Sequence, residues 1–197
     1  MRGSPVPSKN ISIHMHVSSV VTSANQQTIH RRQSETFVLI TSMAKVGHGY
    51  QIGLSWIPDR DGHVPANAIS ISPDIFVARV HQSGDLVPAK VVSRYNKAYC
   101  AHSELEHEHT SYEVLCDTCA PGTRSCYKWE HASGGQVPKR AIVGGLTSNG
   151  SPLYIAKAEI NFEPAIGKVP EGGSCGYFPY GGKEHKSDQY DVLVLDK

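Results

Sequence analysis

The sequence predicts an all-β protein, and two observations support this. Short runs that are apolar, or that alternate between apolar and polar residues, are typical of short strands; Asp74–Val80 and Leu153–Ala158 are examples. Glycine and proline recur about every 8–12 residues and mark turns. No segment keeps a 3.6-residue apolar period with capping residues, as a helix would. We therefore expect small antiparallel β-sandwiches.

The second half of the chain repeats much of the first. Trp56 and Trp129, the only tryptophans, open two similar stretches, Trp-Ile-Pro-Asp-Arg-Asp-Gly-His-Val-Pro and Trp-Glu-His-Ala-Ser-Gly-Gly-Gln-Val-Pro. The offset of 73 residues between them becomes 78 after five extra residues enter the second copy, as between Lys90 and Lys168. Self-similarity of this kind indicates two structural units that pack together.

The duplication divides the chain into four parts. Residues 1–53 form an N-terminal extension, partly β or disordered, with strand-like runs at 11–21 and 35–42 and a basic-basic-x-Ser pattern typical of kinase sites at Arg31–Ser34. Residues 54–116 form the first copy, 117–128 a linker and 129–197 the second copy. The extension has no counterpart in either copy.

Composition excludes several classes of protein. A net charge of +1 argues against nucleic acid as the main ligand, because phosphate binding needs clustered Lys and Arg. No run approaches the roughly 20 apolar residues that cross a bilayer, so we expect no membrane insertion. The first residues lack the apolar stretch of a secretory signal, so we expect a cytoplasmic protein, or one exported without a signal peptide.

Cysteine and histidine leave a local question open. The five cysteines are an odd number, which favours mostly reduced thiols over a disulfide framework. His102, Glu106–His109 and the run Cys116-x-x-Cys119 followed by Cys126 offer zinc ligands in kind, but the spacing is incomplete. We expect no metal, with structural zinc and a local disulfide as equally weighted alternatives. Cys100, opposite Phe178 in the second copy, suggests a small packing residue.

Several motifs recur in the same order in both copies. The second copy reads Val-Pro-x-x-Ala-Ile-Val-Gly-Gly, Ser-Asn-Gly-Ser-Pro-Leu-Tyr-Ile-Ala-Lys-Ala, Ile-Gly-Lys-Val, Tyr-Phe-Pro-Tyr-Gly-Gly-Lys-Glu-His and Tyr-Asp-Val-Leu. The first copy carries degenerate versions, such as Pro-Ala-Lys-Val and Leu-Glu-His. Together the copies, from Trp56 to Leu195, resemble the DM-nine (DM9) repeat family. The resemblance implies a two-repeat module of intertwined β-sandwiches, and the family includes mannose-specific lectins that act as pattern-recognition proteins in innate immunity.

The resemblance also implies a sugar site. In the lectins resembled, an acidic residue in one loop and the Lys of a Pro-Gly-Lys-Val-type segment hold mannose, and Lys168 and Lys90 match this Lys. Where the acid is expected, the second copy has Thr147-Ser148-Asn149, and Asn149 accepts a hydrogen bond without bringing a charge. The first copy lacks five residues here, and Asp74 is its nearest acid. We expect one good site in the second copy and an altered one in the first.

The glutamate and histidine pairs that recur, Glu106-His107 and Glu184-His185, are expected to brace a turn by buried hydrogen bonds rather than to contact a ligand. The paired aromatic residues are expected in the core, with Tyr154 and Tyr177 as weaker candidates for stacking on a sugar.

No enzyme motif is present: there is no nucleophile elbow, phosphate-binding glycine loop or zincin helix. We therefore expect neither catalysis nor a cofactor. The sequence favours a lectin for mannose or mannosylated glycans, and we expect a homodimer whose linked sites raise avidity. One alternative is a scaffold that binds a protein partner and whose sugar site has decayed. Another is a piece of a natterin-type pore-forming protein, although the segment before Gly53 is too short to supply the membrane-inserting domain.

Overall fold

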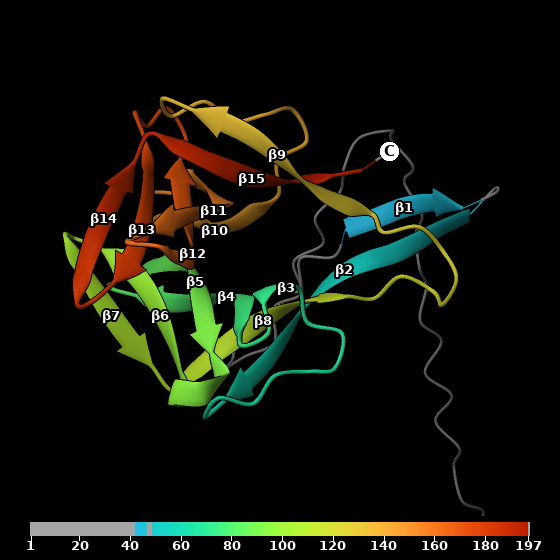
Figure 1. Ribbon diagram of the computed structural model, residues 1–197. Coiled ribbons are helices and arrows are strands. Elements are labelled where there is room, and N and C mark those ends of the chain that lie inside the picture. Colours follow the sequence, from blue (N-terminus) through green and yellow to red (C-terminus); the bar gives the residue numbers. More distant parts are fainter. Residues whose placement is uncertain (1–41, 47–48, 197) are drawn as a thin grey trace, which may run out of the picture.

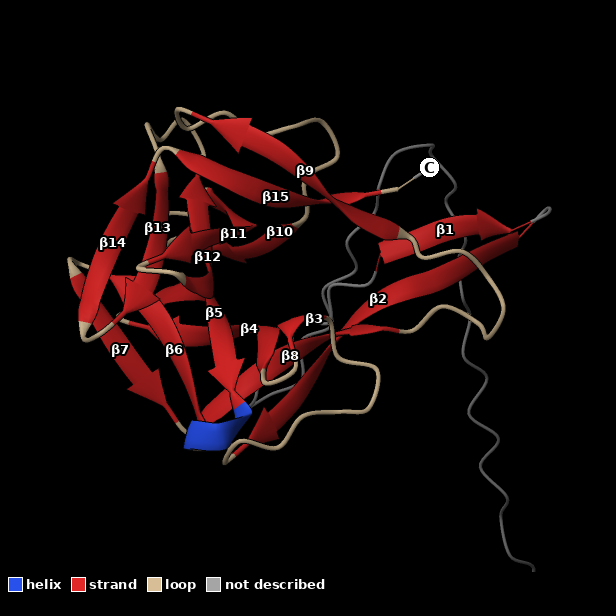
Figure 2. Ribbon diagram, viewed as in Figure 1, coloured by secondary structure: helices blue, strands red, loops and turns tan. Residues whose placement is uncertain are grey.

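The computed structural model describes residues 42–46 and 49–196, which form strands joined by short turns and one 3-10 turn, η1 (Ser93–Tyr95) (Figures 1 and 2). This confirms the all-β prediction. The runs expected at 11–21 and 35–42, apart from Ser42, and the kinase-type pattern at Arg31–Ser34 lie outside the described residues. None of the helices described is long and apolar enough to cross a membrane.

Each copy contributes seven strands in the same order. The first has β2 (Gly49–Arg60), β3 (Ser70–Ser72), β4 (Ile75–Gln82), β5 (Asp85–Val92), β6 (Lys97–His102), β7 (Leu105–His109) and β8 (Ser111–Asp117). The second has β9 (Tyr127–Ser133), β10 (Val143–Leu146), β11 (Pro152–Ile160), β12 (Glu163–Pro170), β13 (Gly176–Tyr180), β14 (Lys183–Ser187) and β15 (Gln189–Leu195). From the N-terminal extension come β1 (Ser42–Val46) and the first residues of β2. The linker occupies the turn between β8 and β9.

The strands follow one continuous antiparallel path, β1-β2-β8-β4-β5-β6-β7-β14-β13-β12-β11-β15-β9. The second half of this path mirrors the first, so that β7 of one copy pairs with β14 of the other through Leu105 and Lys183. β10 makes a second junction, because Leu146 pairs with Leu86 of β5 while β10 also pairs with β11. Figure 1 shows the resulting arrangement, in which β6 and β7 lie beside β13 and β14. The two copies are therefore interlocked, as expected.

The hydrophobic core has three parts. One cluster belongs mainly to the first copy and includes Val80, Val87 and Val114, with Leu153 as its contribution from the second. Another belongs to the second copy and includes Phe178. The third and central cluster draws on both: Leu54, Trp56, Ile69, Ile75, Val77, Val92, Leu115, Cys126, Ile142, Ile155, Ile166 and Leu193. Because burial of apolar area is the main stabilising term in folding, the shared cluster explains why the copies form one body.

Glycine allows the copies to approach closely at one junction. A Cβ atom on Gly145 of β10 would lie 1.9 Å from the carbonyl oxygen of Leu86 in β5. Only a residue without a side chain fits there. This contact brings the loop after β10 to the start of β5, where one of the pockets described next is formed.

Candidate functional site

Two pockets lie where the copies meet, and their linings correspond at the offset of 78 residues. Pocket 1 has a volume of about 300 Å³ and is lined by Ile75, Lys90, Val92, Arg94, Tyr95, Tyr99, Glu106, Glu163, Pro164, Tyr180 and Gly181. Pocket 2 has a volume of about 240 Å³ and is lined by Asp85, His102, Ser103, Thr147, Leu153, Lys168, Pro170, Tyr177 and Glu184. Each pocket therefore combines a Lys, a Glu and a Tyr of one copy with residues of the other.

The lysine of each pocket reaches across to the other copy. Lys168 projects from β12, is 8% exposed, and donates from Nζ to the carbonyl oxygen of Ala101 at 2.5 Å. Lys90 projects from β5, is 7% exposed, and donates to the carbonyl oxygen of Pro179 at 2.6 Å. Ala101 and Pro179 are themselves equivalent positions. The two lysines thus stabilise the interface between the copies as well as lining the pockets.

A glutamate lies beside each lysine. Glu184 Oε1 is 3.2 Å from Lys168 Nζ, and Glu106 Oε1 is 3.4 Å from Lys90 Nζ. The second carboxylate oxygen of each is held by a backbone N–H of the other copy: Glu184 accepts from Glu104 at 2.9 Å and Glu106 from Gly182 at 2.7 Å. Glu184 Oε1 is buried and, within the part of the chain that the structure describes, accepts no hydrogen bond.

The histidines that follow these glutamates have another role. His107 Nε2 contacts the carbonyl oxygen of His102, and His185 Nε2 that of Tyr180, both at 3.0 Å. Both contacts close the turn of a hairpin, β6–β7 or β13–β14, as expected. The glutamates differ from expectation, since they line the pockets in addition to holding a backbone N–H.

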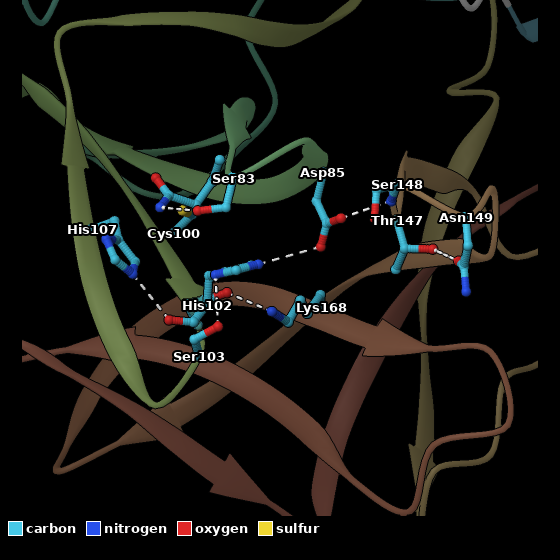
Figure 3. Close-up of polar contacts among 12 residues, drawn as sticks. Ser83, Asp85, Cys100, His102, Ser103, His107, Thr147, Ser148, Asn149 and Lys168 are labelled. Carbon is cyan, nitrogen blue, oxygen red and sulfur yellow. Dashed lines mark hydrogen bonds and ion pairs between the residues drawn. The ribbon is translucent and has the colours of Figure 1, made fainter.

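Each pocket also receives an acid from the opposite copy. Asp85, at the start of β5, lines pocket 2, and its equivalent Glu163, at the start of β12, lines pocket 1. The Asp85 carboxylate accepts from the backbone N–H of Ser148 at 2.7 Å and lies 3.3 Å from Nε2 of His102. Figure 3 shows Asp85 between His102 and Ser148, with Lys168 below His102 and Asp85 in this view. The loop of the second copy is thus tied to an acid of the first.

Burial shifts the pKa of several pocket groups. It lowers the pKa of Lys90 below its ordinary value, while the neighbouring carboxylate of Glu106 opposes the shift. Burial likewise raises the pKa of the Tyr99 hydroxyl, and a hydrogen bond to Cys175 together with burial raises that of Tyr177. Both tyrosines therefore keep their protons near neutral pH and can donate as well as accept.

Three of the five predicted site residues line one of the two pockets. Lys168 and Thr147 line pocket 2, and Lys90 lines pocket 1. Asn149 is not in the lining; its side-chain oxygen accepts from the hydroxyl of Thr147. Asp74 is not in the lining either, and it pairs at 2.6 Å with Arg94, which does line pocket 1.

Sequence reasoning missed the acids that the pockets contain. Asp85 and Glu163 occupy equivalent positions, so their recurrence at the constant offset was the available signal. It was not decisive, because each acid lines the same pocket as the lysine of the opposite copy and no pattern within one copy reveals that arrangement. The same crossing explains His102, which enters pocket 2 from the end of β6.

The chemistry of the pockets is that of polar recognition. Each presents an ammonium, two carboxylates and a tyrosine, groups that can donate hydrogen bonds to, or accept them from, several adjacent hydroxyl groups. Thr147 adds a hydroxyl to pocket 2, whereas pocket 1 has Tyr95, Tyr180 and Arg94 in a more aromatic lining.

Comparisons with known proteins agree with the duplicated fold. A family model described as the DM9 repeat matches residues 71–187. Natterin-4 from Thalassophryne nattereri is 27% identical over 171 residues, which cover 79% of this chain and 38% of Natterin-4. The chain therefore spans well under half of that relative.

Among solved structures, that of the nematode sperm cell motility protein MFP2B is similar, with a TM-score of 0.56 and 16% sequence identity, covering 84% of this chain and 49% of that one. At this identity the similarity concerns the fold alone. Because the family model covers more than half of the sequence, the chain belongs to the DM9 repeat family.

Proposed function

We propose that this protein is a non-catalytic, lectin-like carbohydrate-binding protein and that pocket 2 holds mannose or a mannosylated glycan. Membership of the DM9 repeat family suggests the lectin-like role. Pocket 2 supports it because it joins Lys168 with Thr147, from the loop in which the family resemblance leads us to expect a sugar contact.

The observation that carries the proposal is a buried acceptor beside an incompletely used donor. Glu184 Oε1 is buried and accepts no hydrogen bond from the described residues, although it lines a pocket. Buried acceptors are nearly always satisfied in proteins. Lys168 has three N–H donors, of which one is given to Ala101. Glu184 Oε1 and Lys168 Nζ are 3.2 Å apart, and a sugar hydroxyl beside this ion pair would donate to Glu184 and accept from Lys168.

The other groups of pocket 2 suit the same ligand. The Asp85 carboxylate accepts from further hydroxyls, and the ring of Tyr177 offers an apolar face, with Lys168 Nζ 5.9 Å from its centroid. A hydrogen bond to a charged group contributes about 1.5–3 kcal/mol, so a few such bonds give weak binding after the cost of association. A homodimer, which brings two copies of pocket 2 together, would raise avidity by about 10²–10⁴ where the geometry allows both copies to bind.

The test is retention of the full chain on immobilised mannose. Lys168→Ala should abolish retention because it removes the donor, and Asp85→Asn should weaken it at least several-fold because it removes the charge while keeping the shape. Asp85→Asn is included because Lys168→Ala leaves Glu184 without its cation and can destabilise the fold. Lys128→Ala, on the exposed part of β9 where Lys128 pairs with Glu130, is the control and should bind as the unmodified protein does.

Folding of each variant is checked by circular dichroism. If folded Lys168→Ala and Asp85→Asn proteins are retained like the Lys128→Ala control, pocket 2 is not the mannose site.

A scaffold function has one observation in its favour. Lys90 and Lys168 both donate to a carbonyl of the opposite copy, which by itself accounts for two buried lysines without any ligand. A glycan array separates the two functions, because a scaffold shows no saturable binding to any sugar.

A further inference from the structure

The linker between the copies gathers three metal-type ligands. Asp117, Cys119 and Cys126 each offer one ligand atom, and these atoms lie within 4.8 Å of one another. Asp117 ends β8, and Cys126 immediately precedes β9. The histidine-rich segment of β7 contributes nothing to this cluster. His107 faces the carbonyl oxygen of His102, and His109 lies 3.7 Å from the sulfur of Cys100.

The cysteine pair that the sequence groups together is divided by the fold. Cys116 is buried within the first-copy core, and its sulfur points to the carbonyl oxygen of Val114 at 3.7 Å. Cys119 is instead half-buried in the linker, close to Cys126. The Cys-x-x-Cys motif is therefore not the ligand pair; the sequence-distant Cys126 replaces Cys116.

The surrounding backbone holds the three ligands in place. The backbone N–H of Cys119 donates to Asp117 Oδ1 at 2.9 Å. This bond fixes the carboxylate and leaves Oδ2 as the oxygen that can bind a metal. Cys119 Sγ lies 3.6 Å from the carbonyl oxygen of Gly53 on β2. A Cβ atom on Gly53 would be 2.5 Å from Cys126 Sγ and 3.0 Å from Cys119 Sγ. Glycine at this position therefore keeps open the space in which the sulfurs meet.

We propose that Asp117, Cys119 and Cys126 bind a Zn²⁺ ion, with the fourth position filled by water. Two thiolates and a carboxylate are ligands that zinc prefers, and atoms bound at about 2.0–2.3 Å around one tetrahedral ion are separated by distances within the observed limit. The ion joins the linker to β9 and lies beside β2, so it stabilises the connection between the two copies. Binding displaces the two thiol protons.

The carboxylate distinguishes this site from a disulfide between the same cysteines. Asp117 supplies a metal ligand but has no part in a disulfide. Its negative charge also disfavours the thiolate that oxidation requires.

The test uses the full chain, reduced and freed of metal by dialysis against a chelator. Titration with Zn²⁺ should fill one site per chain that is lost in Cys119→Ser and Cys126→Ser and weakened at least tenfold in Asp117→Asn. Cys116→Ser, altered in the same motif but outside the cluster, should keep the site. The unmodified protein and Cys116→Ser should also gain thermal stability with added Zn²⁺, by mass action, whereas Cys119→Ser should not.

Both Cys116→Ser and Cys119→Ser keep the eleven histidines of the chain. The difference in zinc uptake between these two variants therefore leaves out any zinc bound by histidine. Equal zinc uptake by Cys119→Ser and the unmodified protein overturns the proposal. It is equally overturned by a Cys119–Cys126 disulfide that resists a dithiol reductant under native conditions.

Discussion

Each copy places a cation against its tryptophan, and the two cations differ in burial. Arg79 is fully buried, with its guanidinium 4.3 Å from the ring centroid of Trp56 and Nε 2.6 Å from Glu113. The equivalent Lys157 has a side chain 31% exposed, 4.8 Å from the ring of Trp129 and 3.5 Å from Asp191. The same arrangement thus exists once in the core and once near solvent.

Replacing each cation by alanine should therefore have unequal effects. Breaking a buried pair costs about 3–5 kcal/mol, because the remaining charge loses its partner, whereas a pair exposed like that of Lys157 contributes about 0–1 kcal/mol. We expect Arg79→Ala to lower the free energy of unfolding by about 3–5 kcal/mol and the melting temperature by on the order of 10 °C. Lys157→Ala should lower the free energy by at most about 1 kcal/mol.

Urea denaturation followed by far-ultraviolet circular dichroism measures both variants without relying on the fluorescence of the adjacent tryptophans. Arg79→Lys, which places the residue of the second copy in the first, should lie between the two because a lysine lacks the planar guanidinium. Equal losses for Arg79→Ala and Lys157→Ala would refute the reasoning from burial.

Three other predictions concern single positions. A Cβ on Gly167 would lie 2.0 Å from the carbonyl oxygen of Tyr177 and 2.8 Å from the Phe178 ring. Gly167→Ala should lower the free energy of unfolding by about 1–3 kcal/mol, and adding Phe178→Cys should recover part of this loss. If urea titration shows no recovery, the ring is not the cause. Phe162 is 94% exposed at φ +65°, where the first copy has Gly84; Phe162→Gly should therefore not lower stability and should raise it by up to about 1 kcal/mol, and a loss would reveal packing of the ring. Burial raises the pKa of the Cys100 thiol from 9.0 to about 12, so the unfolded state releases this proton first and stability should fall from pH 9 upward. In urea titrations at pH 8 to 10.5, Cys100→Ala should flatten the fall of the unfolding free energy with pH. An unchanged pH dependence would contradict this prediction.

Much of the fold could be predicted because duplication makes each strand appear twice. The offset between Lys90 and Lys168 identified equivalent strands, and the paired apolar runs identified β4 and β11. The central core was less accessible, since residues such as Trp56, Ile142 and Ile155 meet only once both copies are folded. Periodicity gives the buried face of a strand but not which copy covers it.

The candidate site divides in the same way. Lys168 and Thr147 could be predicted, because they belong to one copy and follow a local motif. Asp85 and His102 could not, because they enter pocket 2 from the other copy by strand pairing distant in sequence. Ala89 pairs with Cys100 in the first copy, and the equivalent positions of the second copy are Gly167 and Phe178. The smaller residue on one strand thus matches the larger residue opposite, which is evident only when the two strands are seen side by side.

The two pockets share their charged groups but differ in the neighbours of those groups, so under the proposed function we expect them to differ in selectivity. Lys, Glu and Tyr occur in both, but His102 of pocket 2 is replaced by Tyr180 in pocket 1, and only pocket 2 has the longer loop with Thr147. The groups proposed to hydrogen-bond sugar hydroxyls are therefore shared, whereas the groups that set the shape of the pocket are not.

We accordingly expect Lys90→Ala to keep retention on mannose while losing a different set of glycans on an array, with Lys168→Ala showing the opposite pattern. Specificity is a difference of affinities, so a change in the lining alone can redirect a shared set of polar groups. If both variants lost the same glycans, the two pockets would act as one site, and the differences in their linings would have no bearing on recognition.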